Sequence, residues 1–299
     1  MILAITGGTG FVGSHLIDHA LESGHTIRAL ARKPQAPRTG VTWIEGALDR
    51  PISLGKLVAG ADAVIHVAGV VSADRRGFVE GNVAGTEGIV AATKAAGIRR
   101  FVAVSSLAAR EPELSDYGWS KAQADERTRL SGLDWTIVRP PAIFGPRDTE
   151  ILELFRMAKH RFVPLPPAGG RMSALYVEDL TALLLLLAED ATMIGRIIEP
   201  DDGMATGWDH RDFIRAIGMA MGVPVTPLPL PPAVLKAVSF VDRAVRRRKA
   251  RLTADRVRYF CHPDWVSHSR PPTSLWQAAV PTPDALAITA AWYRAAGLL

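Results

Sequence analysis

A glycine loop between an apolar run and an amphipathic segment constrains the start of this chain more than any other feature. Residues 1–5 are apolar, which is the pattern of a buried parallel strand. Residues 6–13 hold the loop, residues 14–24 show a helical stripe that ends at a glycine, and residues 26–31 form a second strand pattern. The order strand, glycine loop, helix and strand predicts the first βαβ unit of a parallel sheet.

The loop itself predicts an anion site. Backbone N–H groups and the positive end of a helix dipole converge at such a turn. Gly7 permits the tight turn, Gly10 lets a pyrophosphate approach the backbone, and Gly13 lets the helix lie close to the strand. We therefore expect a dinucleotide here, and its candidate contacts are Gly7, Thr9, Gly10, Phe11, Val12 and Gly13.

Length and composition narrow the class of protein. The chain has 299 residues, of which 48% are hydrophobic and 22% charged, so it is globular and not disordered. Its single cysteine, Cys261, excludes an internal disulfide and fits a reducing compartment. The longest aliphatic run, residues 182–188, is too short to span a bilayer. Because strand residues begin at Met1, we expect no leader and a cytoplasmic protein.

The positive charge is local. The net charge is +5, yet residues 243–258 hold eight basic side chains against one acid, so that window is +7 and the rest of the chain is −2. This distribution is not that of a general nucleic-acid-binding surface. The favoured interpretation is a core-packed helix with a solvated cationic end, and the alternative is a surface that attracts anionic lipids or an anionic substrate.

The alternation of elements predicts an α/β fold with a Rossmann-type doubly wound parallel sheet. Strands are expected at residues 2–6, 26–31, 41–45, 63–67, 101–105 and 135–139, and helices near 11–23, 52–59, 80–96, 117–131 and 150–159. Further helices are expected near 178–189, 209–221, 233–249, 253–260 and 283–296. We assign residues 1–160 to a nucleotide-binding domain, with a returning strand near 195–199, and residues 161–299 to a smaller substrate-binding lobe.

The residues after the second strand indicate which cofactor is bound. A site that prefers NAD places an acid there to bind the ribose 2′-hydroxyl, whereas Arg32 and Lys33 stand where a 2′-phosphate would lie. Guanidinium groups bind phosphate bidentately. We therefore predict NADP, with NAD as the less favoured alternative and two solvated surface cations as the structural alternative.

Other strand ends supply further candidate cofactor contacts. Ala47 and Leu48 follow the third strand and should reach the adenine. Small residues follow the fourth strand, and we expect them close to the cofactor: Val67, Ala68 and Gly69. Asn82 is expected either to cap the next helix or to order the site. His66 is interpreted as a packed residue at the strand end.

Two stretches carry the expected chemistry. Ser105 and Ser106 end a buried strand, and Tyr117 and Lys121 lie four residues apart on one face of the next helix. An ammonium about 4 Å from a phenolate contributes about 4 kcal/mol at an effective dielectric of about 20. That energy would lower the pKa of the phenol from about 10 to about 7, which suits proton transfer at neutral pH. A serine hydroxyl can then hold the substrate oxygen.

With these residues the sequence resembles the extended branch of the short-chain dehydrogenase/reductase family, which includes NAD(P)-dependent epimerases and dehydratases. The likeness covers nearly the whole chain and rests on the glycine spacing, Tyr117-x-x-x-Lys121, residues 66–69, 82–86, 139–146 and 176–179, and the final helix. It implies Tyr117 as general acid/base, Lys121 as the cation that tunes it, and Ser106 as the substrate-orienting hydroxyl, with Ser105 as runner-up and cofactor contact. It also implies that Pro140 and Ile143 lie near the nicotinamide, and it is compatible with a homodimer.

The leading hypothesis is an NADP(H)-dependent oxidoreductase that interconverts a carbonyl and a secondary alcohol by hydride transfer. A nucleotide-sugar epimerase or dehydratase without net redox is the alternative, and a non-catalytic NADP-binding protein is a third reading. We expect a small-molecule substrate, no nucleic acid and no metal. The substrate itself is not specified by the sequence.

Overall fold

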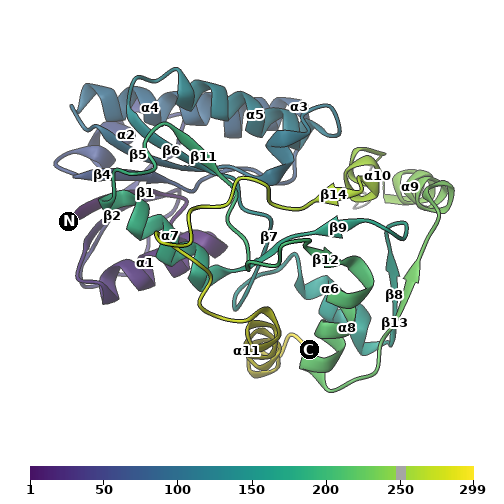
Figure 1. The fold of residues 1–299 in the computed structure, drawn as a ribbon. Helices are drawn as coiled ribbons and strands as arrows, with labels where there is room; N and C mark the ends of the chain where they lie inside the picture. Colours follow the sequence, from purple (N-terminus) through teal and green to yellow (C-terminus); the bar gives the residue numbers. More distant parts are fainter. Residues whose placement is uncertain (247–253) are drawn as a thin grey trace. The chain divides into compact units, whose positions relative to one another are not determined.

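The computed structural model describes the backbone of residues 1–246 and 254–299, and the side chains of residues 1–240 and 255–299. The chain forms two compact units (Figure 1). The first contains residues 1–140 and 177–200, and the second contains residues 141–176 and 201–299. The predicted basic window, residues 243–258, falls largely outside the described side chains.

The first unit is built on a seven-stranded parallel sheet whose order is β11-β6-β5-β4-β1-β2-β3. Its strands are β1 (Ile2–Thr6), β2 (Thr26–Ala31), β3 (Val41–Glu45), β4 (Ala63–His66), β5 (Arg100–Val104), β6 (Asp134–Val138) and β11 (Arg196–Ile198). The strand order reverses between β1 and β4. Sheets of this kind bind their ligands in the crevice at the carboxyl ends of the strands at that point. The predicted Rossmann-type fold is confirmed.

Helices cover both faces of this sheet (Figure 1). One face carries α1 (Phe11–Glu22) and α7 (Val177–Glu189), which pack against each other. The other carries α2 (Pro51–Val58), α4 (Gly85–Ala95) and α5 (Asp116–Arg129). Leu57 of α2, Ile89 of α4 and Phe101 of β5 are fully buried in the core between the second set of helices and the sheet. Each such side chain contributes about 1.5–3 kcal/mol of transfer free energy, which holds the strand ends in place.

Among its described residues, the second unit combines short strands with helices of eight or more residues, of which α9 (Pro232–Arg246) is the longest. One small sheet contains β12 (Trp208–Asp209), β9 (Arg171–Met172) and β14 (Asp264–Trp265). A second pairs β10 (Ala174–Tyr176) with β7 (Ala142–Phe144), and a third pairs β13 (Thr226–Pro229) with β8 (Phe162–Leu165). Helices α6 (Leu152–Lys159), α8 (His210–Met221) and α11 (Thr282–Ala295) pack together, and α10 (Ala254–Cys261) packs on α9.

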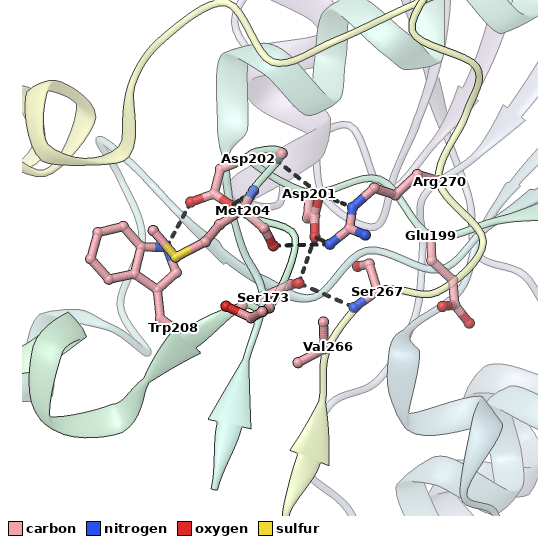
Figure 2. Close-up of polar contacts among 12 residues, drawn as sticks. Ser173, Glu199, Asp201, Asp202, Met204, Trp208, Val266, Ser267 and Arg270 are labelled. Atoms are coloured by element: carbon pink, nitrogen blue, oxygen red, sulfur yellow. Dashed lines mark hydrogen bonds and ion pairs between the residues drawn. The ribbon is translucent and has the colours of Figure 1, made fainter. Parts of the chain in front are cut away.

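A buried ion pair ties three segments of this second unit together (Figure 2). The Asp201 carboxylate accepts hydrogen bonds from Arg270 Nε at 2.8 Å, Arg270 Nη2 at 2.6 Å and Ser173 Oγ at 2.6 Å. Ser173 Oγ in turn accepts from the Ser267 N–H at 3.1 Å. These residues come from three separate stretches of the chain. The cluster therefore fixes residues 173, 201 and 267–270 to one another.

The predicted elements agree with the structure to within about two residues where they are long. The expected returning strand is β11, which pairs in parallel with β6. The helix expected at residues 80–96 is not one continuous α-helix: it consists of a π-helical turn η1 (Val79–Ala84) and α4, and a short helix α3 (Arg75–Phe78) precedes it. The short strands of the second unit were not predicted.

Candidate functional site

The glycine loop has the close backbone contacts that its spacing predicts. Gly7 has a φ of 74°, and a Cβ on it would lie 2.7 Å from the Ala68 nitrogen. A Cβ on Gly13 would lie 2.1 Å from the Gly7 carbonyl oxygen, so any side chain there would displace the loop from α1. The Gly10 N–H donates to the same oxygen at 2.9 Å. Glycine is therefore required sterically at positions 7 and 13.

The start of α1 fits a bound pyrophosphate. Gly10 is the N-cap residue of α1, and no side chain in the described part of the chain caps this helix. The N–H groups of its first turn therefore remain available to an anion. Thr9 and Gly10 are exposed, and Phe11 and Val12 are partly exposed. These residues can hold a dinucleotide phosphate through their backbone.

Two cations and one apolar turn lie at neighbouring strand ends. Arg32 and Lys33 follow β2 and are both exposed. The turn with Ala47 and Leu48 rests on α4, where a Cβ on Gly85 would lie 2.7 Å from Leu48 Cδ1. The contacts of these residues with a nucleotide stay predictions.

A relay of hydrogen bonds fixes the strand end at His66. The Ala68 N–H donates to Thr6 Oγ1 at 3.2 Å, and Thr6 Oγ1 lies 2.7 Å from His66 Nδ1. His66 Nε2 lies 3.1 Å from Thr86 Oγ1, whose own proton goes to the Asn82 carbonyl oxygen at 2.7 Å. Since Thr86 must accept, the relay assigns the proton of neutral His66 to Nε2. Burial, and secondarily the Lys121 charge, lower the pKa of His66 to about 3. His66 is thus the packed residue that we expected.

Asn82 holds a loop and does not cap a helix. It sits inside the π-helical turn η1, and its Oδ1 accepts from the Val70 N–H at 2.7 Å. Its Nδ2 donates to the Val70 carbonyl at 3.0 Å and to Ser120 Oγ at 2.8 Å. Asp74, not Asn82, accepts the capping hydrogen bond at the start of this helical run. The second of the two predicted roles, ordering the site, is the one that the contacts support.

Tyr117 and Ser106 lie together at the end of β5. Ser106 accepts a hydrogen bond from the Ala108 N–H at 3.2 Å, which leaves its own proton free to donate. Burial raises the pKa of Tyr117, the nearby Ser106 hydroxyl lowers it by a smaller amount, and the Asp125 charge raises it further. The net direction is opposite to the predicted lowering. Although the Tyr117 side chain is partly exposed, it is densely surrounded by protein atoms, and this surrounding opposes ionisation.

Lys121 points to the strand end. Its Nζ donates to the Val104 carbonyl oxygen at 3.0 Å, and a Cβ on Gly69 would lie 3.1 Å from it. Burial lowers the pKa of Lys121 to about 8, against the opposing charge of Asp125. Its ammonium therefore lies beside the loop after β4, and it is not among the groups that shift the pKa of Tyr117.

Asp125 is a site residue that the sequence reading missed. It lies one turn beyond Lys121 on α5 and is buried, and it accepts from Arg139 Nε at 2.8 Å. Burial raises its pKa, while the Arg139 charge lowers it. Ser105 Oγ lies near enough to lower the same pKa, but it forms no hydrogen bond with any described residue. The i, i+4 spacing from Lys121 was the available signal.

A small internal cavity joins these groups. Residues from β4, β5 and the helices of one sheet face line it: His66, Ala68, Asn82, Thr86, Ala103, Val104, Ser105, Lys121, Ala124, Asp125 and Thr128. Four of the predicted site residues line this cavity: Ala68, Asn82, Ser105 and Lys121. Pro140 lies two residues after the end of β6 in the same unit, and its carbonyl accepts from the Leu107 N–H at 3.1 Å. Ile143 lies on β7 of the second unit, and its expected nicotinamide contact stays a prediction.

The described residues contain neither a cluster of metal ligands nor a membrane-spanning helix. Among them, no three His, Cys, Asp or Glu side chains gather as metal ligands. No helix in the same part of the chain is long and apolar enough to cross a membrane.

The sequence is similar to an NAD(P)H-binding family model and to curated reductases. A family model described as NAD(P)H-binding matches residues 7–156. The ceramide reductase of Caulobacter vibrioides is 35% identical, and the alignment covers 100% of this chain and 96% of that protein. The 2-alkyl-3-oxoalkanoate reductase of Stenotrophomonas maltophilia is 30% identical over 80% of this chain and 79% of its own length.

Solved structures share the fold. MoeE5 in complex with UDP-glucose and NAD superposes with a TM-score of 0.76 at 19% identity and covers 99% of each chain. The UDP-glucose 4-epimerase of Thermotoga maritima superposes with a TM-score of 0.74, also at 19% identity and 99% coverage of each chain. At this identity the likeness concerns the fold alone.

Proposed function

Because the chain belongs to the extended short-chain dehydrogenase/reductase family, we propose that it is an NADP(H)-dependent reductase that converts a carbonyl on a long-chain, lipid-like molecule to a secondary alcohol. The family is one of NAD(P)-dependent oxidoreductases and epimerases, and the protein is an enzyme of this type. The direction of the reaction, the cofactor and the substrate class are our proposals.

One observation carries the proposal: the hydroxyls of Ser106 and Tyr117 lie together at the sheet edge where Lys121 is buried. Because Ser106 Oγ accepts from the Ala108 N–H, its own proton can be donated to a carbonyl oxygen. Tyr117 is protonated at neutral pH, because burial raises its pKa, so it is ready to donate a proton to a forming alkoxide. A general acid in its protonated form suits reduction better than oxidation.

The nicotinamide would supply the hydride when the cofactor is bound. The chain's own groups would hold the cofactor. The first turn of α1 would bind the pyrophosphate, and Arg32 and Lys33 would bind the 2′-phosphate. The Lys121 ammonium, next to Gly69, lies where it can bind a ribose hydroxyl. Asp125 keeps a negative charge one turn away from that ammonium and favours its protonated form.

The substrate class rests on the relatives. One relative that aligns over the full chain at 35% identity is named a ceramide reductase, and a second relative is named a 2-alkyl-3-oxoalkanoate reductase. Both names describe reduction of a molecule that carries alkyl chains. The UDP-sugar complexes among the structural neighbours are far less similar in sequence.

The test follows the absorbance of reduced nicotinamide with the purified protein. NADPH and NADH are each offered with a long-chain 3-oxo ester, a short-chain 3-oxo ester and a UDP-sugar. Oxidation of NADPH that depends on the long-chain ester supports the proposal. Epimerised UDP-sugar without net loss of NADPH contradicts it, and so does tight NADPH binding with no turnover of any carbonyl.

A further inference from the structure

Helix α9 exposes an unusual amount of apolar surface. Phe240 is 76% exposed, Val238 is 47% exposed and Val234 is 42% exposed. Ala233 and Ala237 are exposed as well. At about 100° per residue these five side chains fall on one broad arc of the helix. The opposite side carries Ser239, which is buried, and Leu235, which is partly buried.

The fold leaves this arc without a partner among the described residues. Within its unit α9 packs on α10, and the buried position of Ser239 shows that its other side faces the protein. A contiguous apolar patch of this kind marks a site of interaction on a protein surface. Isolated exposed apolar residues are normal, but five on one arc of one helix are not.

Charge indicates what covers the arc. Lys236 is exposed on α9 itself, and the sequence window 243–258, which begins in the last turn of the helix, has a net charge of +7. An apolar helix face next to a basic stretch is the pattern of helices that lie in the plane of an anionic lipid surface. A second copy of this chain fits less well, because two windows of +7 would meet like charge with like.

We propose that α9 docks on an anionic lipid surface through Val234, Val238 and Phe240, with the positive charge of the window 243–258 as the long-range attraction. The helix lies in the interface and does not span it. Docking brings the enzyme to a substrate that resides in the lipid phase, and this last step alone rests on the proposed function.

The test measures binding of the full-length protein to vesicles by flotation. Vesicles are made of phosphatidylcholine alone or of phosphatidylcholine mixed with phosphatidylglycerol. We expect binding to the anionic vesicles that weakens as salt is added, because counterions screen the attraction. The double variant V238S/F240S should bind them about tenfold more weakly, since two apolar side chains no longer enter the interface.

A matched control is Ile52→Ser on α2, because Ile52 is 80% exposed and lies on an unrelated helix of the first unit. It should bind vesicles as the wild type does. All three proteins should keep the same melting temperature, since the changed side chains are exposed.

Several outcomes overturn the proposal. Docking on lipid is excluded if the wild type ignores anionic vesicles at low salt, or if V238S/F240S binds as well as wild type. A dimer that V238S/F240S dissociates in gel filtration would identify a second copy as the occupant instead. Vesicle binding without reduction of any carbonyl would refute the proposed function and leave docking intact. With a water-soluble carbonyl substrate the double variant should turn over as wild type, and only turnover of vesicle-borne substrate should fall.

Discussion

Each unit of the molecule buries a polar cluster, but the two clusters differ in what surrounds their charged groups. In the second unit, Asp201 is a carboxylate surrounded by matched donors from Arg270 and Ser173. In the first unit, Lys121 and Asp125 line a cavity together with Ser105. A carboxylate that is bonded to matched donors holds chain segments together, whereas charged groups that line a cavity can also contact a ligand. We therefore expect losses in the first unit to reduce turnover and losses in the second to reduce stability.

The sharpest test of this contrast is Tyr117→Phe. Loss of the phenolic proton should lower kcat by about 10²–10⁴-fold, the usual contribution of a general acid, with little change in the free energy of unfolding. Steady-state kinetics with NADPH and urea unfolding measure the two quantities. Unchanged turnover would remove Tyr117 from the mechanism.

The converse test is Asp201→Ala. It leaves the Arg270 guanidinium without its carboxylate, and because Arg270 keeps about a third of its side chain exposed, we expect a loss of about 3 kcal/mol in unfolding free energy, the low end for a broken buried pair. The double variant D201A/R270M should recover part of that loss in urea unfolding. A double variant no more stable than Asp201→Ala would show that the charge left behind is not the cost.

Lys121 predicts a dependence of stability on pH. Its pKa is lowered from 10.5 to about 8 in the folded protein. Between these values the unfolded lysine keeps its proton while the folded one has lost it, so this group's contribution to stability should rise with pH, by about 1 kcal/mol per pH unit. The difference in unfolding free energy between wild type and Lys121→Met, measured at several pH values, isolates this group. A difference that stays constant above pH 8 would be inconsistent with a buried ammonium.

The hydrogen-bond relay is tested by Thr86→Val. This change preserves the shape but leaves His66 Nε2–H without its acceptor and removes the hydroxyl's hydrogen bond to the Asn82 carbonyl, which should cost about 1–3 kcal/mol. The matched control is Thr289→Val on α11. The Thr289 hydroxyl also donates to a carbonyl four residues back, but this hydrogen bond involves no histidine. Equal losses in the two variants would show that the relay adds nothing.

The smallest expected effect concerns exposed charge. Replacing Arg32 and Lys33 by alanine should raise the KM for NADPH about tenfold and leave the KM for NADH unchanged, because both side chains are solvated and only the 2′-phosphate needs them. Equal effects on the two cofactors would contradict the prediction of NADP.

The sequence predicts the first unit well and the second poorly, for a physical reason. The central strands β1, β4 and β5 consist mainly of apolar runs, because both faces of the sheet are covered there. Strands such as β9 and β14 contain two residues each, and their pairing depends on residues about 90 positions apart. No local pattern encodes such a contact. The same holds for Asp125, whose sequence position suggests a surface acid on a helix, whereas in the fold Arg139, directly after β6, donates a hydrogen bond to it.

The chemistry of Tyr117 was less predictable than its position. The i, i+4 spacing placed it and Lys121 on one helical face, but spacing says nothing about which atom the ammonium contacts. The Val104 carbonyl binds Lys121, and burial decides the pKa of Tyr117. Direction and burial of side chains are tertiary properties.

The π-helical turn η1 carries one residue more than an α-helical path would need. Deleting a single residue there, for example Gly81, would let the backbone relax into an ordinary α-helix without breaking the run from α3 to α4. Because the extra residue of a π-helical turn is accommodated locally, α3 and α4 would keep their faces and only the side chains of the turn would change direction, so Asn82 would lose its hydrogen bonds to Val70 and Ser120. A one-codon deletion could thus uncouple the strand-end loop from α5 while sparing the scaffold, which makes this turn a natural point for evolution, or for engineering, to retune the enzyme.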